Sequence, residues 1–242
     1  MKRNFTPEEL LTRWEARREI QNVVGKVSQS YLMMEEAAIY DRFWSKREDV
    51  ALGVNEGWYA GAEAVKGYYD ALGRKIALSS CLIADRFPEK LAGKTEEELY
   101  GVGQLGVKPV DTFIIEIAGD GQTAKGIWSL HGTYADITPS GPVSYWDWGY
   151  WCLDFVLEDG AWKILHMQDL KDINNPTGGD WADRPLSFPE DPAFAAMKDF
   201  DFPKPNVPAK LRETYYPGRP FTETPPLPEP YETFAETFSY GM

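Results

Sequence analysis

The chain has 242 residues, of which 43% are hydrophobic and 14% aromatic, so it can bury a substantial core and general disorder is excluded. Its formal net charge of −13 disfavours nucleic acid or an anionic membrane surface as a partner. Two cysteines, Cys81 and Cys152, are too few for a disulfide framework or a zinc site. Because we see neither a signal peptide nor a long apolar span, we expect a cytoplasmic protein.

The first part of the chain carries helical patterns. Thr6-Pro7-Glu8-Glu9 predicts a helix start with a capping box. A second helix is predicted from about Glu35 to Trp44, and a third from Gly61 to Leu72, closed by Gly73, with a short strand over residues 49–54 between them. Apolar residues at helical spacing predict one buried stripe on the first helix, made of Leu10, Trp14, Ile20, Val24, Val27, Tyr31 and Met34.

After a polar insertion at about residues 86–106, the pattern changes to strands. These are predicted over Val110–Ile117, Thr123–Tyr134, Val143–Leu157 and Ala161–Asp169. Helices followed by a meander of long antiparallel strands predict an α+β fold with a curved sheet over residues 1–175.

The remaining segment, residues 176–242, holds 13 of the 18 prolines, interleaved with aromatic residues. Proline at this density prevents regular helix or sheet, and the aromatic residues argue against a free linker. We therefore expect an extended arm that wraps over the domain or over a neighbouring subunit.

Three local motifs, in this order, carry a family resemblance. They are GWYAGAEAV at residues 57–65, IEIAGDGQTA at 115–124 and DGAWKI at 159–164. Together with the order of elements they resemble the SnoaL-like branch of the NTF2-like superfamily. The resemblance implies a cone of helices packed on a strongly curved antiparallel sheet around a pocket, as in scytalone dehydratase-type and related cofactor-independent lyases, dehydratases and isomerases.

The resemblance also implies candidate catalytic residues. His131 matches a strand position where scytalone dehydratase carries a catalytic histidine, and Lys108 stands where many members have a second histidine. Tyr31 and Glu35 stand where many members carry Tyr-x-x-x-Asp on the first helix. With Lys108 in the usual histidine position, His166 on the final strand could supply the second proton-transfer group.

Imidazole is the side chain best suited to move protons near neutral pH, so we expect both histidines to converge on one cavity. The alternatives are histidines held by hydrogen bonds in the core and a solvated Lys108. Inside a pocket, Lys108 could stabilise an oxyanion or titrate low enough to act as a base.

An aromatic run over residues 145–151 is the most unusual part of the sequence. In a strand it places Tyr145, Asp147, Gly149 and Trp151 on one face and the intervening aromatic residues on the other. We expect one face to line the pocket, which makes Asp147 and Trp151 candidate substrate contacts, although core packing explains the run almost as well. Tyr59 and Trp44 are further candidates.

The leading hypothesis is a lyase, dehydratase or isomerase that acts without cofactor or metal on an aromatic or polycyclic small molecule. The alternative is a non-catalytic module of NTF2-like fold that binds a small molecule or a protein. A metal enzyme ranks third, since no ligand spacing supports it. We expect a homo-oligomer, either a dimer or a trimer. A further alternative is the small subunit of an oxygenase, a class of protein that shares this fold and requires a large catalytic partner.

Overall fold

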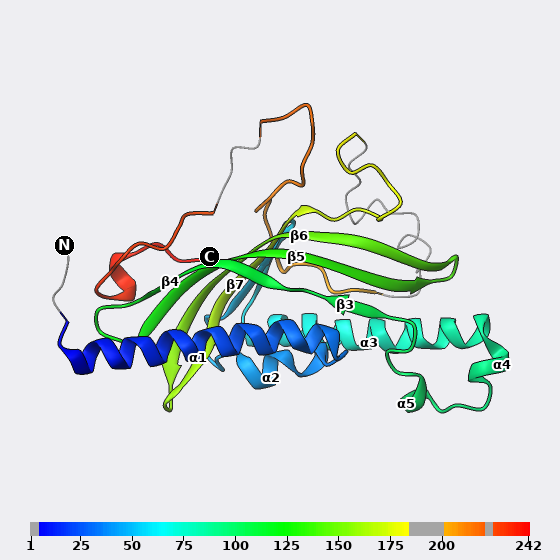
Figure 1. The fold of residues 1–242 in the computed structure, drawn as a ribbon, viewed down its shortest axis with the longest axis horizontal. Helices are drawn as coiled ribbons and strands as arrows, with labels where there is room; N and C mark the ends of the chain where they lie inside the picture. Colours follow the sequence, from blue (N-terminus) through cyan, green and yellow to red (C-terminus); the bar gives the residue numbers. More distant parts are fainter. Residues whose placement is uncertain (1–4, 184–200, 221–224) are drawn as a thin grey trace.

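A computed structural model of the chain describes residues 5–183, 201–220 and 225–242 (Figure 1). A layer of helices lies along one face of a strongly curved sheet, and residues 225–242, the end of the C-terminal arm, lie on the other side (Figure 1). The helices are α1 (Pro7–Leu32), α2 (Ile39–Phe43), α3 (Ala62–Arg86), α4 (Pro88–Leu91) and α5 (Glu96–Leu99), with 3-10 turns η1 (Glu36–Ala38) and η3 (Phe234–Glu236). The strands are β1 (Ala51–Val54), β2 (Gly57–Ala60), β3 (Leu105–Val107), β4 (Val110–Ile117), β5 (Thr123–Thr138), β6 (Gly141–Glu158), β7 (Ala161–Ile173) and β8 (Val207–Pro208).

The eight strands form one sheet in the order β3-β5-β6-β7-β1-β2-β8, and β4 pairs with β5 beyond the end of β3. All neighbouring strands run antiparallel except β1 and β7. The α+β prediction is therefore confirmed, including the curved sheet covered by helices on one face.

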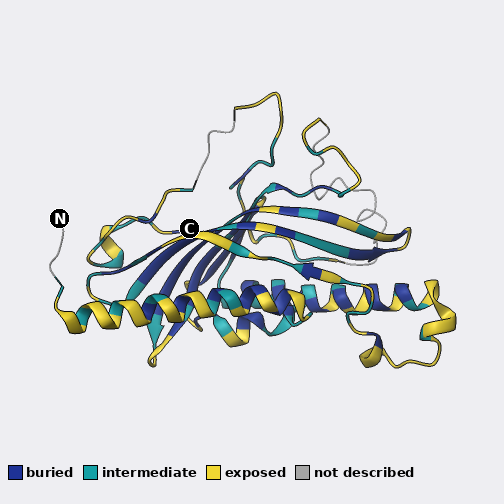
Figure 2. Ribbon diagram, viewed as in Figure 1, coloured by how far each residue is buried: buried dark blue, intermediate teal, exposed yellow. Residues whose placement is uncertain are grey.

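Helix α1 begins as predicted, with both hydrogen bonds of the capping box between Thr6 and Glu9. Its central and C-terminal turns bury Ile20, Val24, Val27 and Tyr31. The prediction of one buried apolar stripe is wrong at both ends of the helix. Leu10 and Trp14 are 55% and 70% exposed, in the first turns of α1, which are largely exposed (Figure 2), and Met34 lies after the helix has ended.

Helix α3 is twice as long as predicted, because Gly73 does not end it. A Cβ at Gly73 would lie 2.8 Å from the Cβ of Ala37 in η1. The glycine is therefore required for close packing of α3 against η1 rather than for a helix terminus. The predicted helix over 35–44 is divided into η1 and α2.

The short strands β2, β3 and β8 were not predicted, since two to four residues carry no clear periodicity. The described part of the arm packs on its own chain. Residues 201–216 follow the β1–β2 hairpin, and residues 225–242 contact β5, β6 and β7. The arm residues Phe188, Phe194, Phe200 and Phe221 lie outside the described residues.

Candidate active site

A cavity of about 430 Å³ lies between the helices and the sheet face that they cover. Its wall combines tyrosines with paired charged groups, and the arm closes one side. The lining includes Tyr31, Glu36, Tyr59, Tyr68, Lys75, Lys108, Tyr134, Asp136, Asp147, Asp169, Lys171, Phe202 and Thr214.

Four alternating charges form the polar centre of this cavity. Lys108, just after β3, places its Nζ 2.8 Å from Oδ2 of Asp147 on β6. On β7, Lys171 lies 2.7 Å from Oδ1 of Asp147 and 2.6 Å from Oδ1 of Asp169. Asp169 and Lys171 share a face because they are two residues apart in a strand. Two ammonium groups thus balance two carboxylates.

Lys108 and Asp147 remain charged near neutral pH. Burial opposes the charge on Lys108, but the carboxylates of Asp147 and Asp169 outweigh it and raise the pKa of Lys108 above its ordinary value. Burial also opposes the charge on Asp147, yet Lys108 and Lys171 hold the pKa of Asp147 at about 2. The option that Lys108 titrates low and acts as a base is therefore wrong: it is a fixed cation.

Glu36, the first residue of η1, is the carboxyl group that suits proton transfer. It lines the cavity with only 7% of its surface exposed, and its Oε2 has no hydrogen-bond partner among the described residues. Burial raises the pKa of Glu36 to about 7, although its own backbone N–H and the nearby ammonium groups of Lys108 and Lys75 oppose the rise. Both protonation states are therefore accessible near neutral pH.

The tyrosines of the cavity are hydrogen-bond donors at neutral pH. Burial raises the pKa of Tyr31 well above its ordinary value and that of Tyr59 to about 12. The ring of Tyr31 lies 4.4 Å from the Lys108 ammonium, which adds a cation–π contact. Tyr134 donates to Oδ1 of Asn174 at 2.9 Å.

The structure thus brings together four of the predicted site residues: Tyr31, Tyr59, Lys108 and Asp147. Trp151 lies behind the cavity, fully buried, and its indole N–H donates to Oδ1 of Asp169 at 2.9 Å. It holds Asp169 in place rather than contacting a ligand.

Two further predicted site residues lie elsewhere. Trp44 is fully buried against Tyr69 and does not line the cavity, so its prediction as a substrate contact is wrong. Glu35 is exposed and pairs with Arg42 outside the cavity. The neighbouring Glu36 takes the inward position, because α1 ends at Leu32 and Met34 adopts a positive φ of 57°, which breaks the helical phase.

His131 is on the outer face of the sheet. Its partner across the β5–β6 ladder is Trp148, whereas the next pair, Gly132 and Asp147, faces the cavity. The imidazole side chain is 50% exposed and lies 3.4 Å from the carboxylate of Asp111. The prediction that His131 enters the cavity is therefore wrong.

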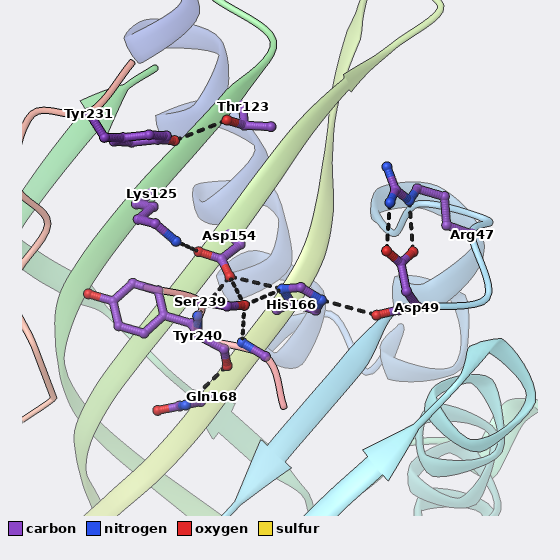
Figure 3. A network of polar contacts seen from close by, with 11 residues as sticks. Arg47, Asp49, Thr123, Lys125, Asp154, His166, Gln168, Tyr231, Ser239 and Tyr240 are labelled. Atoms are coloured by element: carbon purple, nitrogen blue, oxygen red, sulfur yellow. Dashed lines mark hydrogen bonds and ion pairs between the residues drawn. The ribbon is translucent and has the colours of Figure 1, made fainter. Parts of the chain in front are cut away.

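His166 belongs to a second polar network, which Figure 3 shows beneath the C-terminal segment. Its Nδ1 lies 2.9 Å from Oδ2 of Asp154, and its Nε2 lies 3.0 Å from the carbonyl oxygen of Asp49. Asp154 also accepts from Lys125 at 2.6 Å, from the Ser239 hydroxyl at 2.9 Å and from the Tyr240 backbone N–H at 2.8 Å (Figure 3).

This network anchors the arm and does not form an active site. Ser239 and Asp154 both approach the same ring nitrogen of His166, so no serine–histidine–aspartate relay can operate. Lys125 and Asp154 are fully buried, and Gly241 covers the imidazole of His166. The two histidines therefore do not converge, and within the described residues His166 does not line the cavity between the helices and the sheet.

A second hollow of about 680 Å³ runs along the outer side of residues 208–219. In its lining, Glu213 pairs with both Lys210 and Arg219. Because it holds none of the buried charge network, we assign the chemistry to the inner cavity.

Within the described ranges, no cluster of three or more histidine, cysteine, aspartate or glutamate side chains has the arrangement of a metal site. In the same part of the chain, none of the helices combines the length and apolar character needed to cross a membrane.

No protein-family model and no curated protein sequence matches the chain. Similar solved structures include a hexachlorocyclohexane dehydrochlorinase, LinA-type3, from Novosphingobium barchaimii LL02, at 14% identity over 70% of this chain and 95% of that chain, with a TM-score of 0.47. An NTF2-like superfamily protein from Salmonella enterica matches at 9% identity over 64% and 90%, with a TM-score of 0.46. The Kfla4162 protein from Kribbella flavida matches at 11% over 66% and 92%, with a TM-score of 0.47.

The matching structures include a protein named as NTF2-like, which is the resemblance predicted from the sequence. Identities this low carry neither an activity nor a residue's role over to this chain.

Proposed function

We propose that the protein is a cofactor-independent lyase, dehydratase or isomerase of a small ring-bearing molecule, in which Glu36 transfers the proton. The observation that carries the proposal is a buried carboxyl group in the wall of a cavity that also holds a fixed ammonium group; one oxygen of this carboxyl has no hydrogen-bond partner within the described part of the chain.

The arrangement supports chemistry next to a carbonyl group. Glu36 in its ionised form removes a proton from the carbon beside the carbonyl. The Lys108 ammonium and the Tyr31 hydroxyl are suited to stabilise the negative charge that develops on the oxygen. Return of the proton to another carbon gives isomerisation. Transfer of the same proton to a leaving β-hydroxyl group releases water and gives dehydration.

The charge network keeps Lys108 in place for this role. Asp147 holds the ammonium at 2.8 Å, Lys171 fixes Asp147 from the other side, and Trp151 and Lys171 fix Asp169. A donor that is already oriented needs little reorganisation when charge develops on the substrate.

Proton abstraction is testable without the natural substrate. 2-Tetralone, an uncharged bicyclic ketone, is incubated in D₂O at neutral pH, and NMR follows exchange of its α-protons with and without protein. Glu36→Gln should lower the protein-dependent exchange rate by at least about 100-fold, the usual contribution of a general base. Lys108→Met should lower it by about 100-fold or more, as expected for loss of an oxyanion donor.

Glu35→Gln is the matched control, because Glu35 is the adjacent exposed glutamate outside the cavity. It should retain the wild-type exchange rate. Thermal unfolding of each variant separates lost chemistry from lost folding. Exchange that is unchanged in Glu36→Gln would refute the assignment of the base, and exchange no faster than in buffer would favour the non-catalytic binding module.

A further inference from the structure

One wall of the cavity comes from the arm and not from the helices and sheet. We call residues 201–216 the strap. Phe202 near its start and Thr214 near its end both line the cavity, and the segment between them follows the β1–β2 hairpin. The strap therefore contributes to the shape of the cavity although it lies outside the region that carries the family resemblance.

The strap is firmly attached on both sides of this hairpin. The Asn206 side chain accepts from the backbone N–H of Ala60 at 2.8 Å and donates to its carbonyl at 2.9 Å. The hydroxyl of Tyr59 donates to the carbonyl of Pro203 at 2.6 Å. Further along, Arg212 pairs with Asp172 at 2.7 Å. Phe202 is thus held by neighbours that are themselves hydrogen-bonded to the sheet.

Phe202 completes an aromatic corner with two tyrosines of the cavity wall. Its ring meets that of Tyr68 edge-on at 5.3 Å, and Tyr68 lies 4.9 Å from Tyr59. Because these rings meet edge-on or tilted, they form an angular apolar corner in which the edge or face of another ring can pack. The four-charge centre, with Lys108, lines the same cavity.

The three lysines of the cavity wall are all paired with aspartates. Lys108 and Lys171 face Asp147 and Asp169, and Lys75 pairs with Asp136 at 2.5 Å. Burial raises the pKa values of both Glu36 and Glu56, because it disfavours a negative charge at either position. An ionised ligand would lose hydration without meeting an unpaired opposite charge, so the cavity favours an uncharged ligand.

We propose that the strap makes the cavity selective for uncharged molecules with two or more fused rings, with Phe202 as the residue that recognises the outer ring. This proposal names the ligand class of the cavity and so rests on the proposed function for the choice of site. It adds that the arm, through one side chain, decides between single-ring and fused-ring ligands.

Binding of 2-naphthol and phenol, measured by calorimetry, tests the proposal. Both are uncharged at pH 7, and they differ by one ring. We expect wild-type protein to bind 2-naphthol more tightly than phenol. Phe202→Ala should reduce this preference about tenfold, mainly by lowering the affinity for 2-naphthol, because the substitution removes one ring contact and the apolar area of that ring. Phe202→Trp should retain the preference.

Tyr216→Ala is the matched control, an aromatic-to-alanine change at an exposed residue at the end of the strap and outside the cavity lining. It should leave both affinities unchanged. 2-Naphthoate, ionised at pH 7, should bind at least tenfold more weakly than 2-naphthol to wild-type protein. A melting temperature for each variant confirms that the fold is intact.

Three results would overturn the proposal. The first is no saturable binding of 2-naphthol to the wild-type protein, and the second is an equal loss of affinity for 2-naphthol and phenol in Phe202→Ala. The third is tighter binding of 2-naphthoate than of 2-naphthol to the wild-type protein. These outcomes are distinguishable from failure of the proposed function. If 2-naphthol binds with the expected dependence on Phe202 while 2-tetralone shows no exchange, the ligand class stands and the catalytic role fails.

Discussion

Glu36 should make the protein less stable as the pH rises, and Glu36→Gln should remove this dependence. The carboxyl group is 7% exposed, and burial raises its pKa from 4.5 to about 7. Glutamine keeps the shape of the protonated acid but cannot ionise. The variant therefore isolates the cost of placing a charge at this position.

The sign and magnitude follow from linkage between folding and protonation. Below about pH 4.5, Glu36 is protonated in both the folded and the unfolded state and contributes no pH dependence. Between pH 4.5 and about 7 the unfolded chain releases the proton while the folded protein keeps it, so the free energy of unfolding falls. Above pH 7 both states are ionised, and the folded protein is less stable by about 3 kcal/mol.

Urea unfolding of both proteins at intervals from pH 4 to pH 8.5 measures this effect. The difference in unfolding free energy should shift in favour of Glu36→Gln by about 3 kcal/mol across the range, with most of the shift between pH 4.5 and 7. The other titrating groups largely cancel in the difference, since both proteins share them. A difference that does not change with pH would refute the claim that Glu36 has a raised pKa and with it the basis for its role as the base.

Two further predictions concern the sites that the sequence suggested and the structure reassigned. Asp154→Asn should lower the free energy of unfolding by about 3–5 kcal/mol, because it leaves the fully buried Lys125 without its carboxylate. Urea unfolding measures this difference. A decrease in unfolding free energy of less than about 1 kcal/mol would contradict the anchoring role. Its control, Asp111→Asn, alters an exposed carboxylate beside His131 and should change stability by less than about 0.5 kcal/mol. His131→Ala should retain the wild-type rate of 2-tetralone exchange, and a large loss of exchange with an intact fold would return that histidine to the mechanism.

Where a local rule applies, the sequence was sufficient. The capping box at Thr6 and Glu9 needs only neighbouring residues, and the structure contains it. The alternation in the aromatic run has the same basis, since successive side chains of a strand point to opposite faces. Tyr145, Asp147 and Trp151 are buried as one face, while Trp148 on the other is 36% exposed.

The tertiary structure decided which of these residues share a cavity. The face on which His131 lies depends on its pairing with Trp148, and the strand sequence alone is compatible with either face. Glu36 replaces Glu35 because the chain leaves the helical path at Met34, which a helical projection cannot show. Lys108 becomes a fixed cation only through carboxylates from β6 and β7, which are far from it in sequence.

The sequence by itself therefore determined the α+β fold, the ends of several elements and the inward face of Asp147, because helical and strand periodicity are local properties. Tyr31 and Lys108 were suggested by the family resemblance and not by periodicity. Only the tertiary structure decided that Glu36, and neither histidine, lines the cavity and that Phe202 of the arm contributes to its wall. The physical reason is that pKa values and cavity walls arise from burial and from charges that distant segments bring together.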